Sequence, residues 1–368
     1  MTAELTTDLT VELPERFLLT AEHYTDAALW PVERTHIFQR TWLYLGDSDQ
    51  LTVGQVWVRQ VVGKPVVITC TAPGEFHAFH NVCLHRASLL CNANGISSQK
   101  HLICPYHAWV YDLAGNLVGV PSQQKFSESF KAKDYTLQPI RLETWCGFLF
   151  ICFTDDAPPL HTFLGSIPTH LGQHRRDETR LLFTQRKTVA CNWKNFHDNT
   201  LCDYHVAIAH RHTLHKVQGP IKYYEHQLET YTNLLRTPVL NSWQADNSTL
   251  SDLPELGRTS FLTYGIFPNL HLLGLPNGIL AWLYIEPLTP DTCELRSEVY
   301  GIPQLSPPLE TLQADFDAFT NEDIALTESV QKGYASGTYR PGPVNQLEAR
   351  IIHQQQLILK FLQLDPHP

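Results

Sequence analysis

Two short pairs of cysteine and histidine constrain the fold of this chain more than any other feature. Cys83 and His85 form a Cys-x-His pair, and after eighteen intervening residues Cys104 and His107 form a Cys-x-x-His pair. Thiolate and imidazole are both strong metal ligands, and side chains this close in sequence lie on one loop. The pattern therefore predicts two loops that close around a metal centre, each supplying one cysteine and one histidine.

The composition of this ligand set distinguishes two kinds of metal centre. Cys₂His₂ is a structural zinc set, but the single residue between Cys83 and His85 is tighter than the roughly two to four residues usual at zinc sites. A Rieske [2Fe–2S] cluster requires two cysteines on one iron and two histidines on the other. The even division over two loops favours this cluster, and zinc is the alternative. By itself such a cluster specifies electron transfer and no substrate.

The 368 residues exceed what one hydrophobic core usually organises, and their pattern predicts two domains. Short alternating stretches separated by turns predict a small antiparallel β domain up to Phe153, and a linker follows at 155–159. Beyond the linker the pattern becomes mixed. It predicts helices over 193–210, 309–331 and 347–362 and strands around 261–263, 270–273, 279–285 and 294–300.

Charge and hydropathy exclude several classes of protein. The chain carries 27 Lys and Arg against 37 Asp and Glu, a formal balance of −10, which argues against nucleic-acid binding. No apolar run approaches the roughly 18 residues that a membrane span requires. The nine cysteines are an odd number and a poor disulfide framework, and the first residues show no signal-peptide pattern. We therefore expect a cytoplasmic protein without a membrane segment.

Two histidines five residues apart, His205 and His210, indicate a second metal site. With a distant carboxylate they form the 2-His-1-carboxylate set of non-heme Fe(II) oxygenases, whose open positions admit O₂ beside the substrate. The spacing alone is weak evidence, because the neighbouring His197, His212 and His215 give a surface cluster the same appearance.

The segments 81–87 and 104–115 resemble the Rieske domain of the Rieske non-heme iron oxygenases. The resemblance implies an α+β fold: an N-terminal antiparallel β Rieske [2Fe–2S] domain followed by a helix-grip (START/SRPBCC-like) catalytic domain with a curved antiparallel sheet and C-terminal helices. It implies a Rieske domain over 41–156, a catalytic mononuclear iron domain over 157–368, and an N-terminal segment, 1–40, that packs on the catalytic domain.

The same resemblance implies the ligands of both metal centres. Cys83, His85, Cys104 and His107 bind the cluster, and His205 and His210, which follow an Asn-Trp-Lys motif, bind the single iron. The segment 321–333 resembles the family's C-terminal helix motif, in which the aspartate of a Glu-Asp pair is a ligand, so Asp323 is expected as the third. The alternatives for the third ligand are Glu322 and Glu328.

Members of the family place an acid three or sometimes four residues before the first histidine ligand, where it bridges to a Rieske histidine of the neighbouring subunit. Here those positions hold Cys202 and Leu201, while Asp203 lies two residues upstream. Residues i and i+2 of a regular helix do not share a face, so Asp203 can bridge only if the helix is distorted. We expect Asp203 and Asn199 as catalytic residues. The alternatives for the bridge are Cys202, Asn199 and Asp198.

The resemblance implies a terminal oxygenase with one Rieske [2Fe–2S] cluster and one mononuclear non-heme Fe(II) per chain, which uses O₂ and two electrons to hydroxylate a small organic substrate. The chain contains no Gly-x-Gly-x-x-Gly fingerprint, so a separate NAD(P)H-dependent reductase is expected to supply the electrons, directly or through a ferredoxin. The family forms a head-to-tail homotrimer, a closed ring in which the cluster of one subunit serves the iron of the next.

The region around the Asn-Trp-Lys motif and the tail over 337–348 resemble the branch that acts on quaternary amines such as choline, carnitine or betaines. Aromatic faces can hold such cations. The candidates for an aromatic cage are Tyr204, Trp243, Phe261, Tyr264, Phe267, Trp282 and Tyr284. Hydroxylation of an aromatic or alicyclic ring is the alternative. A remoter one is a non-catalytic Rieske electron carrier fused to a ligand-binding domain, which would need no second metal site.

Overall fold

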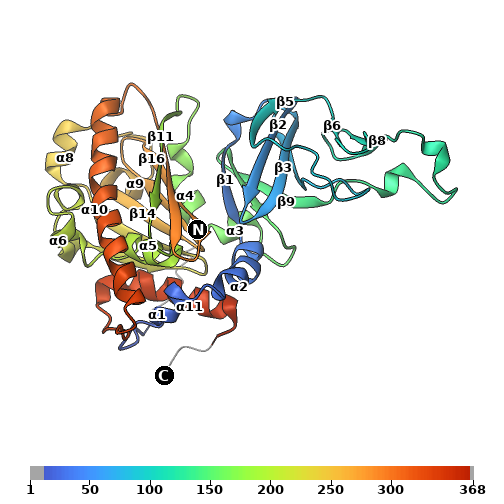
Figure 1. Ribbon diagram of the computed structural model, residues 1–368. Coiled ribbons are helices and arrows are strands. Elements are labelled where there is room, and N and C mark those ends of the chain that lie inside the picture. The colour runs from blue at the N-terminus through green and yellow to red at the C-terminus, as the bar shows by residue number, and fades with distance from the viewer. Residues whose placement is uncertain (1–11, 365–368) are drawn as a thin grey trace, which may run out of the picture. The chain divides into compact units, whose positions relative to one another are not determined.

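The computed structural model describes residues 12–364 and divides them into two compact units (Figure 1). One unit is the continuous segment Phe38–Leu160. The other joins the described residues up to Ile37 to those from His161 onward. Each unit has its own antiparallel sheet, which confirms the predicted α+β class. No helix within residues 12–364 is long and apolar enough to cross a membrane.

The unit Phe38–Leu160 is built on a seven-stranded antiparallel sheet in the order β1-β10-β9-β4-β3-β2-β5, with a small sheet in the order β6-β7-β8. The strands are β1 (Leu43–Asp47), β2 (Gln55–Val61), β3 (Lys64–Ala72), β4 (Glu75–His80), β5 (Gly95–Ser98), β6 (Leu102–Ile103), β7 (Val110–Tyr111), β8 (Leu117–Gly119), β9 (Pro139–Trp145) and β10 (Phe148–Cys152). The hairpins β2–β3 and β9–β10 both turn in two residues.

Both of these tight turns place a non-glycine residue before glycine in the left-handed region. In the first turn, Val62 and Gly63 have φ values of 49° and 75°, and in the second, Cys146 and Gly147 have values of 49° and 79°. Positive φ at both central residues defines a turn whose twist matches that of paired strands. The turns thereby fix the register of the seven-stranded sheet, whose strand β4 leads into the loop of Cys83 and His85; the loop of Cys104 and His107 joins β6 to β7 of the small sheet.

The other unit is built on a second seven-stranded antiparallel sheet, in the order β11-β17-β16-β15-β14-β13-β12. Its strands are β11 (Arg180–Val189), β12 (Glu225–Leu228), β13 (Thr232–Pro238), β14 (Ser260–Ile266), β15 (Leu270–Gly274), β16 (Leu280–Thr289) and β17 (Thr292–Gly301). The four strands that the sequence predicted correspond to β14 to β17, and only the predicted start at 279 falls outside, one residue before β16.

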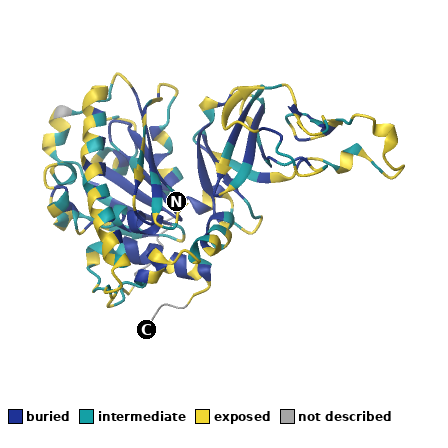
Figure 2. Ribbon diagram, viewed as in Figure 1, coloured by how far each residue is buried: buried dark blue, intermediate teal, exposed yellow. Residues whose placement is uncertain are grey.

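The helices are α1 (Ala21–Thr25), α2 (Leu29–His36), α3 (Leu160–Phe163), α4 (Ile167–Leu171), α5 (Trp193–Thr200), α6 (Val206–Ala209), α7 (Leu214–Gln218), α8 (Asn241–Asp246), α9 (Glu255–Thr259), α10 (Leu309–Ala335) and α11 (Ala349–Leu362). The longest, α10, packs against α5, α1 and β11. Its buried residues recur every three or four positions and form one face (Figure 2): Leu312, Phe316, Phe319, Thr320, Asp323, Thr327 and Gln331. Asp323 is the only acid among them.

The prediction of one continuous helix over 193–210 is wrong. The helix α5 ends at Thr200 and α6 begins at Val206, so the segment between them is not helical. The backbone N–H of Asp203 donates to the carbonyl of Leu347, 3.2 Å away, instead of to a carbonyl one turn earlier. This contact with a distant residue takes the backbone at Asp203 out of regular helix. A departure from regular helix is the condition that the sequence set for Asp203 to act as a bridge.

A buried ion pair joins the N-terminal segment to α5. Lys194 binds Glu33 of α2, and the side chains of the two are 1% and 2% exposed. Glu33 also accepts a hydrogen bond of 2.8 Å from Nε1 of Trp193. A buried pair of this kind contributes little by itself, but removing one partner leaves an uncompensated charge.

We expect Glu33→Ala to destabilise the protein by about 3–5 kcal/mol, because the buried Lys194 is left without its ion-pair partner. Urea unfolding followed by circular dichroism measures the loss. Glu294→Ala is the control, because it breaks a half-exposed ion pair with Arg186 and should cost about 0–1 kcal/mol. Equal losses in the two variants would contradict the assignment.

Candidate metal centres

The two Cys and His loops adopt the same backbone turn. The N–H of Ala87 donates to the carbonyl of Cys83, and the N–H of Ala108 donates to that of Cys104, both at 3.0 Å. Each turn closes with an alanine in the left-handed region, at φ values of 57° and 53°. Such a conformation is uncommon outside glycine, and its presence in both loops gives them matching geometry.

The side chains of these loops suit a two-iron cluster. Cys83 and Cys104 are 1% and 2% exposed. The rings of His85 and His107 lie 4.5 Å apart between centroids, and Nδ1 of each is buried without a hydrogen-bond partner. Unpartnered buried nitrogens are costly, which indicates that both await a ligand. Two thiolates and two imidazoles match a Rieske cluster.

Tyr111 lies beside one of these cysteines. Its hydroxyl oxygen accepts a hydrogen bond of 3.2 Å from the N–H of Leu84, and the Sγ atom of Cys83 is 3.6 Å away. Since the oxygen already accepts from the backbone, its own hydrogen is directed to the sulfur. Asn81 holds the same loop, because its amide donates to the carbonyl of Cys91 at 2.7 Å. The hydrogen bond to sulfur stabilises the more negative, reduced form of a cluster.

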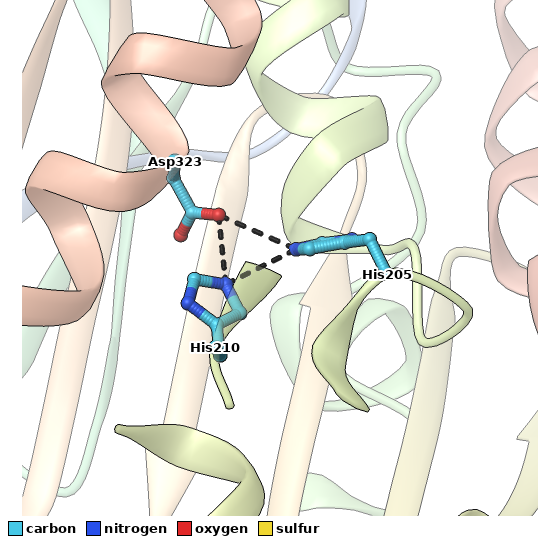
Figure 3. A group of neighbouring side chains, drawn as sticks. All are labelled: His205, His210 and Asp323. Atoms are coloured by element: carbon cyan, nitrogen blue, oxygen red, sulfur yellow. Dashed lines mark hydrogen bonds and ion pairs between the residues drawn. The ribbon is translucent and has the colours of Figure 1, made fainter. Parts of the chain in front are cut away.

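The second centre brings together His205, His210 and Asp323 (Figure 3). The two Nε2 atoms are 3.1 Å apart, and the Oδ1 atom of Asp323 is 3.0 Å from that of His210 and 3.4 Å from that of His205. Ligand atoms roughly 2.1 Å from one metal ion and at right angles to each other are about 3.0 Å apart. The three atoms therefore fit one face of an octahedral metal site.

Neighbouring residues orient these three side chains. Glu322 accepts from Nδ1 of His210 at 2.7 Å, which fixes this ring with Nε2 facing His205 and Asp323. Thr213 donates to the same carboxylate at 2.6 Å. Asn199 donates to Oδ1 of Asp323 at 2.6 Å. Both predicted acids of the Glu-Asp pair thus lie at the site, with Asp323 facing the histidine nitrogens and Glu322 behind one of them.

Electrostatics keeps Asp323 in the form that binds metals. Burial by itself raises the pKa of this carboxyl, but hydrogen bonds from His205 and His210 hold the pKa below its usual value. Burial opposes a charge on His205, yet the contacts with Asp323 and Cys202 raise the pKa of this imidazole to about 9. A metal ion must therefore displace protons from the histidines when it binds. Glu328, the other alternative ligand, instead accepts from the N–H of Ala190.

The triad opens onto a cavity of about 60 Å³. Its other walls are Asn199, Thr200, Cys202, Asp203, Val206, Leu214, Gln218, Leu235, Thr263, His271, Leu273, Leu283 and Phe319. Among these described residues Phe319 is the only Phe, Tyr or Trp. Polar and aliphatic residues both line the cavity, and most of the surface that they expose to it is apolar.

None of the seven expected cage aromatics lines this cavity, so the prediction of a cage built from them is wrong. The reason is that most of these rings pack elsewhere. Trp282 is fully buried, the hydroxyl of Tyr264 bonds Ser166 and His170, and Tyr204 is 54% exposed. Strand periodicity gives the face of the sheet that a ring occupies but not the cavity it meets.

Asp203 lies in the cavity wall and is 3% exposed. Its carboxylate accepts a hydrogen bond of 2.8 Å from Nε2 of His226 and pairs with Arg350 at 3.3 Å. Sequence reasoning did not find His226 or Arg350. The residues lie 23 and 147 positions from Asp203, and no motif or spacing relates them.

We expect Tyr111→Phe to lower the reduction potential of the cluster by about 20–60 mV, since one hydrogen bond to sulfur is lost. A redox titration followed by electron paramagnetic resonance measures the shift. Tyr106→Phe is the control, because the hydroxyl of Tyr106 bonds the exposed side chain of Arg86 and not a cysteine. An unchanged potential in Tyr111→Phe would disprove the contact with sulfur.

Glu322→Gln should weaken iron retention at the triad about 10–100-fold, because the charged partner that orients His210 is lost. Iron content after dialysis against a series of chelator concentrations measures the effect, with the visible absorbance of the cluster as an internal reference. Glu328→Gln alters an acid on the same helix that bonds only the backbone, and it should retain iron normally. Identical retention by both variants would rule out the role given to Glu322.

Comparisons with known proteins agree with both centres. The family model of the Rieske [2Fe-2S] domain matches residues 41–140, and that of the ring hydroxylating alpha subunit (catalytic domain) matches residues 169–364. The chloroplastic choline monooxygenase of Amaranthus tricolor is 30% identical over 336 residues, which cover 87% of this chain and 72% of that protein. The glycine betaine monooxygenase oxygenase subunit of Chromohalobacter salexigens is 26% identical over 367 residues, covering 88% and 80%.

Solved structures share the fold. The quaternary ammonium Rieske monooxygenase CntA in complex with gamma-butyrobetaine aligns with a TM-score of 0.76 and 23% identity over 95% of this chain and 96% of that chain. Naphthalene 1,2-dioxygenase from Rhodococcus sp. aligns with a TM-score of 0.72 and 21% identity over 95% and 94%. The chain therefore belongs to the Rieske non-heme iron oxygenases, as an alpha subunit that carries a Rieske [2Fe–2S] cluster and a mononuclear iron.

Proposed function

We propose that this oxygenase hydroxylates a small quaternary amine of the choline, carnitine or betaine type, with O₂ and two electrons from a separate NAD(P)H-dependent reductase, directly or through a ferredoxin. The observation that carries the proposal is the likeness to choline monooxygenase, which spans both the Rieske and the catalytic regions of the chain. The likeness to glycine betaine monooxygenase spans them too.

The cavity supports a small aliphatic substrate. Most of its accessible surface is apolar, which suits the methyl groups of a trimethylammonium head. The walls at Leu235, Leu273 and Leu283 are apolar and face the same space as the triad. Methyl groups on a quaternary nitrogen pack against such walls.

We assign the ligands as follows. Cys83 and Cys104 bind one iron of the cluster and His85 and His107 bind the other, which the unpartnered Nδ1 atoms support. The mononuclear iron is assigned to His205, His210 and Asp323, which the spacing of their ligand atoms supports. When bound, the cluster supplies electrons one at a time and the iron activates O₂.

Residues around the triad fix the orientation of its side chains. Glu322 fixes the ring of His210, and Asn199 fixes the carboxylate of Asp323, so neither ligand needs to reorganise. The apolar walls exclude bulk water from the space in front of the triad. Asn199 is thereby a positioning residue in this proposal.

We further propose a homotrimer in which the cluster of one subunit serves the iron of the next. A CntA structure described as giving insight into inter-subunit electron transfer shares the fold, with a TM-score of 0.77 at 23% identity. The part of Asp203 as the bridge across that interface stays a prediction, because its carboxylate is bonded to His226 and Arg350 of its own chain.

The cytoplasm is the proposed location. All nine cysteines lie in the described part of the chain, and no disulfide joins any two of them, as expected in a reducing compartment.

The experiment that tests the function is NADH-dependent O₂ uptake with a suitable reductase over a panel of choline, glycine betaine, carnitine, biphenyl and naphthalene. We expect stimulated uptake and a hydroxylated product, identified by mass spectrometry, with at least one quaternary amine. Turnover of an aromatic compound alone would favour ring hydroxylation, to which the alpha subunit of biphenyl 2,3-dioxygenase from Rhodococcus jostii, 33% identical over 52% of this chain, gives some support.

Metal analysis separates an oxygenase from a carrier. The wild-type protein should contain three irons per chain, and Asp323→Ala should lose one of them while it keeps the visible spectrum of the cluster, because the triad loses its only carboxylate. Two irons in the wild-type protein, or normal iron content in Asp323→Ala, would refute the assignment of the triad.

A further inference from the structure

One side chain in the cavity wall is held by a buried guanidinium. Arg350 of α11 is fully buried, and His271 of β15 is 3% exposed and lines the cavity. Nη2 of Arg350 lies 3.1 Å from Nε2 of His271 and 3.2 Å from the carbonyl of Thr263. The remaining nitrogens of Arg350 bond Asp203 and Asn233. Every side of the guanidinium is therefore engaged, and its position is fixed.

This contact determines which ring nitrogen of His271 carries hydrogen. A guanidinium only donates hydrogen bonds, so Nε2 of His271 is the acceptor and holds no hydrogen. Burial, together with the positive charge of Arg350, also lowers the pKa of this imidazole well below its ordinary value. The ring is neutral, and its single hydrogen lies on Nδ1.

The Nδ1 hydrogen has no acceptor among the described residues. No hydrogen bond joins Nδ1 to the protein, and Nδ1 is not one of the enclosed atoms that lack a partner. His271 is one of the residues that line the cavity beside the triad, so the cavity is where this donor can meet a bound molecule. Its neighbours in the wall, Leu273 and Leu283, are aliphatic, so the donor of His271 has no polar competitor from these two residues.

We propose that the Nδ1–H group of His271 binds an oxygen atom of the substrate and selects quaternary amines that carry a hydroxyl or a carboxylate near the cationic nitrogen. The inference rests on the proposed function and deepens it. A neutral N–H can donate to either kind of oxygen, and because the ring is already fixed, substrate binding does not have to order it. His271 is a specificity residue, and Arg350 is the positioning residue that sets its tautomer.

The test pairs each oxygen-bearing substrate with an analogue of nearly the same shape that lacks the oxygen. Choline is compared with propyltrimethylammonium, and glycine betaine with (2-methylpropyl)trimethylammonium. Steady-state kinetics with the holoenzyme and calorimetric binding under anaerobic conditions are measured for the wild type, His271→Phe and His271→Gln. Three irons per chain in each variant show that the metal centres are intact.

We expect His271→Phe to raise KM and lower kcat/KM about 10-fold for a hydroxyl substrate and about 10–100-fold for a carboxylate substrate, since a donor to an uncharged or a charged oxygen is lost. The analogues without oxygen should change less than about twofold. His271→Gln should restore part of the preference, because its amide can accept from Arg350 and still donate to the cavity.

Equal losses for both members of a pair would show that His271 only supports the wall, and would overturn the inference while leaving the proposed function intact. Unchanged preference in His271→Phe would overturn it as well. If no quaternary amine supports turnover or binding in the wild-type protein, the proposed function fails and the inference fails with it.

Discussion

A carboxylate on the buried face of α10 is the constraint on which the catalytic unit depends. Asp323 is 7% exposed, and a charged group in that position is tolerated only when it is paired and hydrogen-bonded. The amide of Asn199 and the rings of His205 and His210 meet that demand. Those partners come from α5 and the segment after it. The end of α5, the break in the helix and the position of α10 together determine whether they can reach the carboxylate of Asp323. Without a metal ion, the two imidazole rings and the carboxylate are joined by hydrogen bonds, and a metal ion would replace these bonds by binding all three groups.

The two metal centres differ in how much of them a sequence can reveal. The Cys and His loops each lie within a few residues, so local spacing alone was enough to predict their ligand set. The triad joins residues 113 positions apart, and only the resemblance of the Glu-Asp pair to a known motif pointed to Asp323. The orienting contacts from Glu322 and Asn199 depend on the relative rotation of two helices, which spacing does not encode.

Errors in the sequence analysis arise where tertiary contacts override local preference. Residues 193–210 have a helical pattern, but the hydrogen bond from Asp203 to the carbonyl of Leu347 takes the backbone out of the helix. The aromatic residues of β14 to β16 were correctly placed on strands, yet which of them meets the cavity depends on the packing of both faces. The guanidinium of Arg350, which fixes two residues of the cavity wall, came from a helix that the pattern showed only as amphipathic.

The discontinuity of the catalytic unit has a consequence for biosynthesis. Glu33 finds its partner 161 positions later, and the whole of the unit Phe38–Leu160 is translated between them. At roughly 5–20 residues per second, the ribosome takes about 8–30 s to reach Lys194. During that interval the unit Phe38–Leu160 can fold on the nascent chain, while the apolar and acidic groups of the N-terminal helices remain exposed to water. The segment that carries Glu33 is thus translated well before its partner Lys194 and is enclosed only after that residue has been made, and until then a chaperone can bind it.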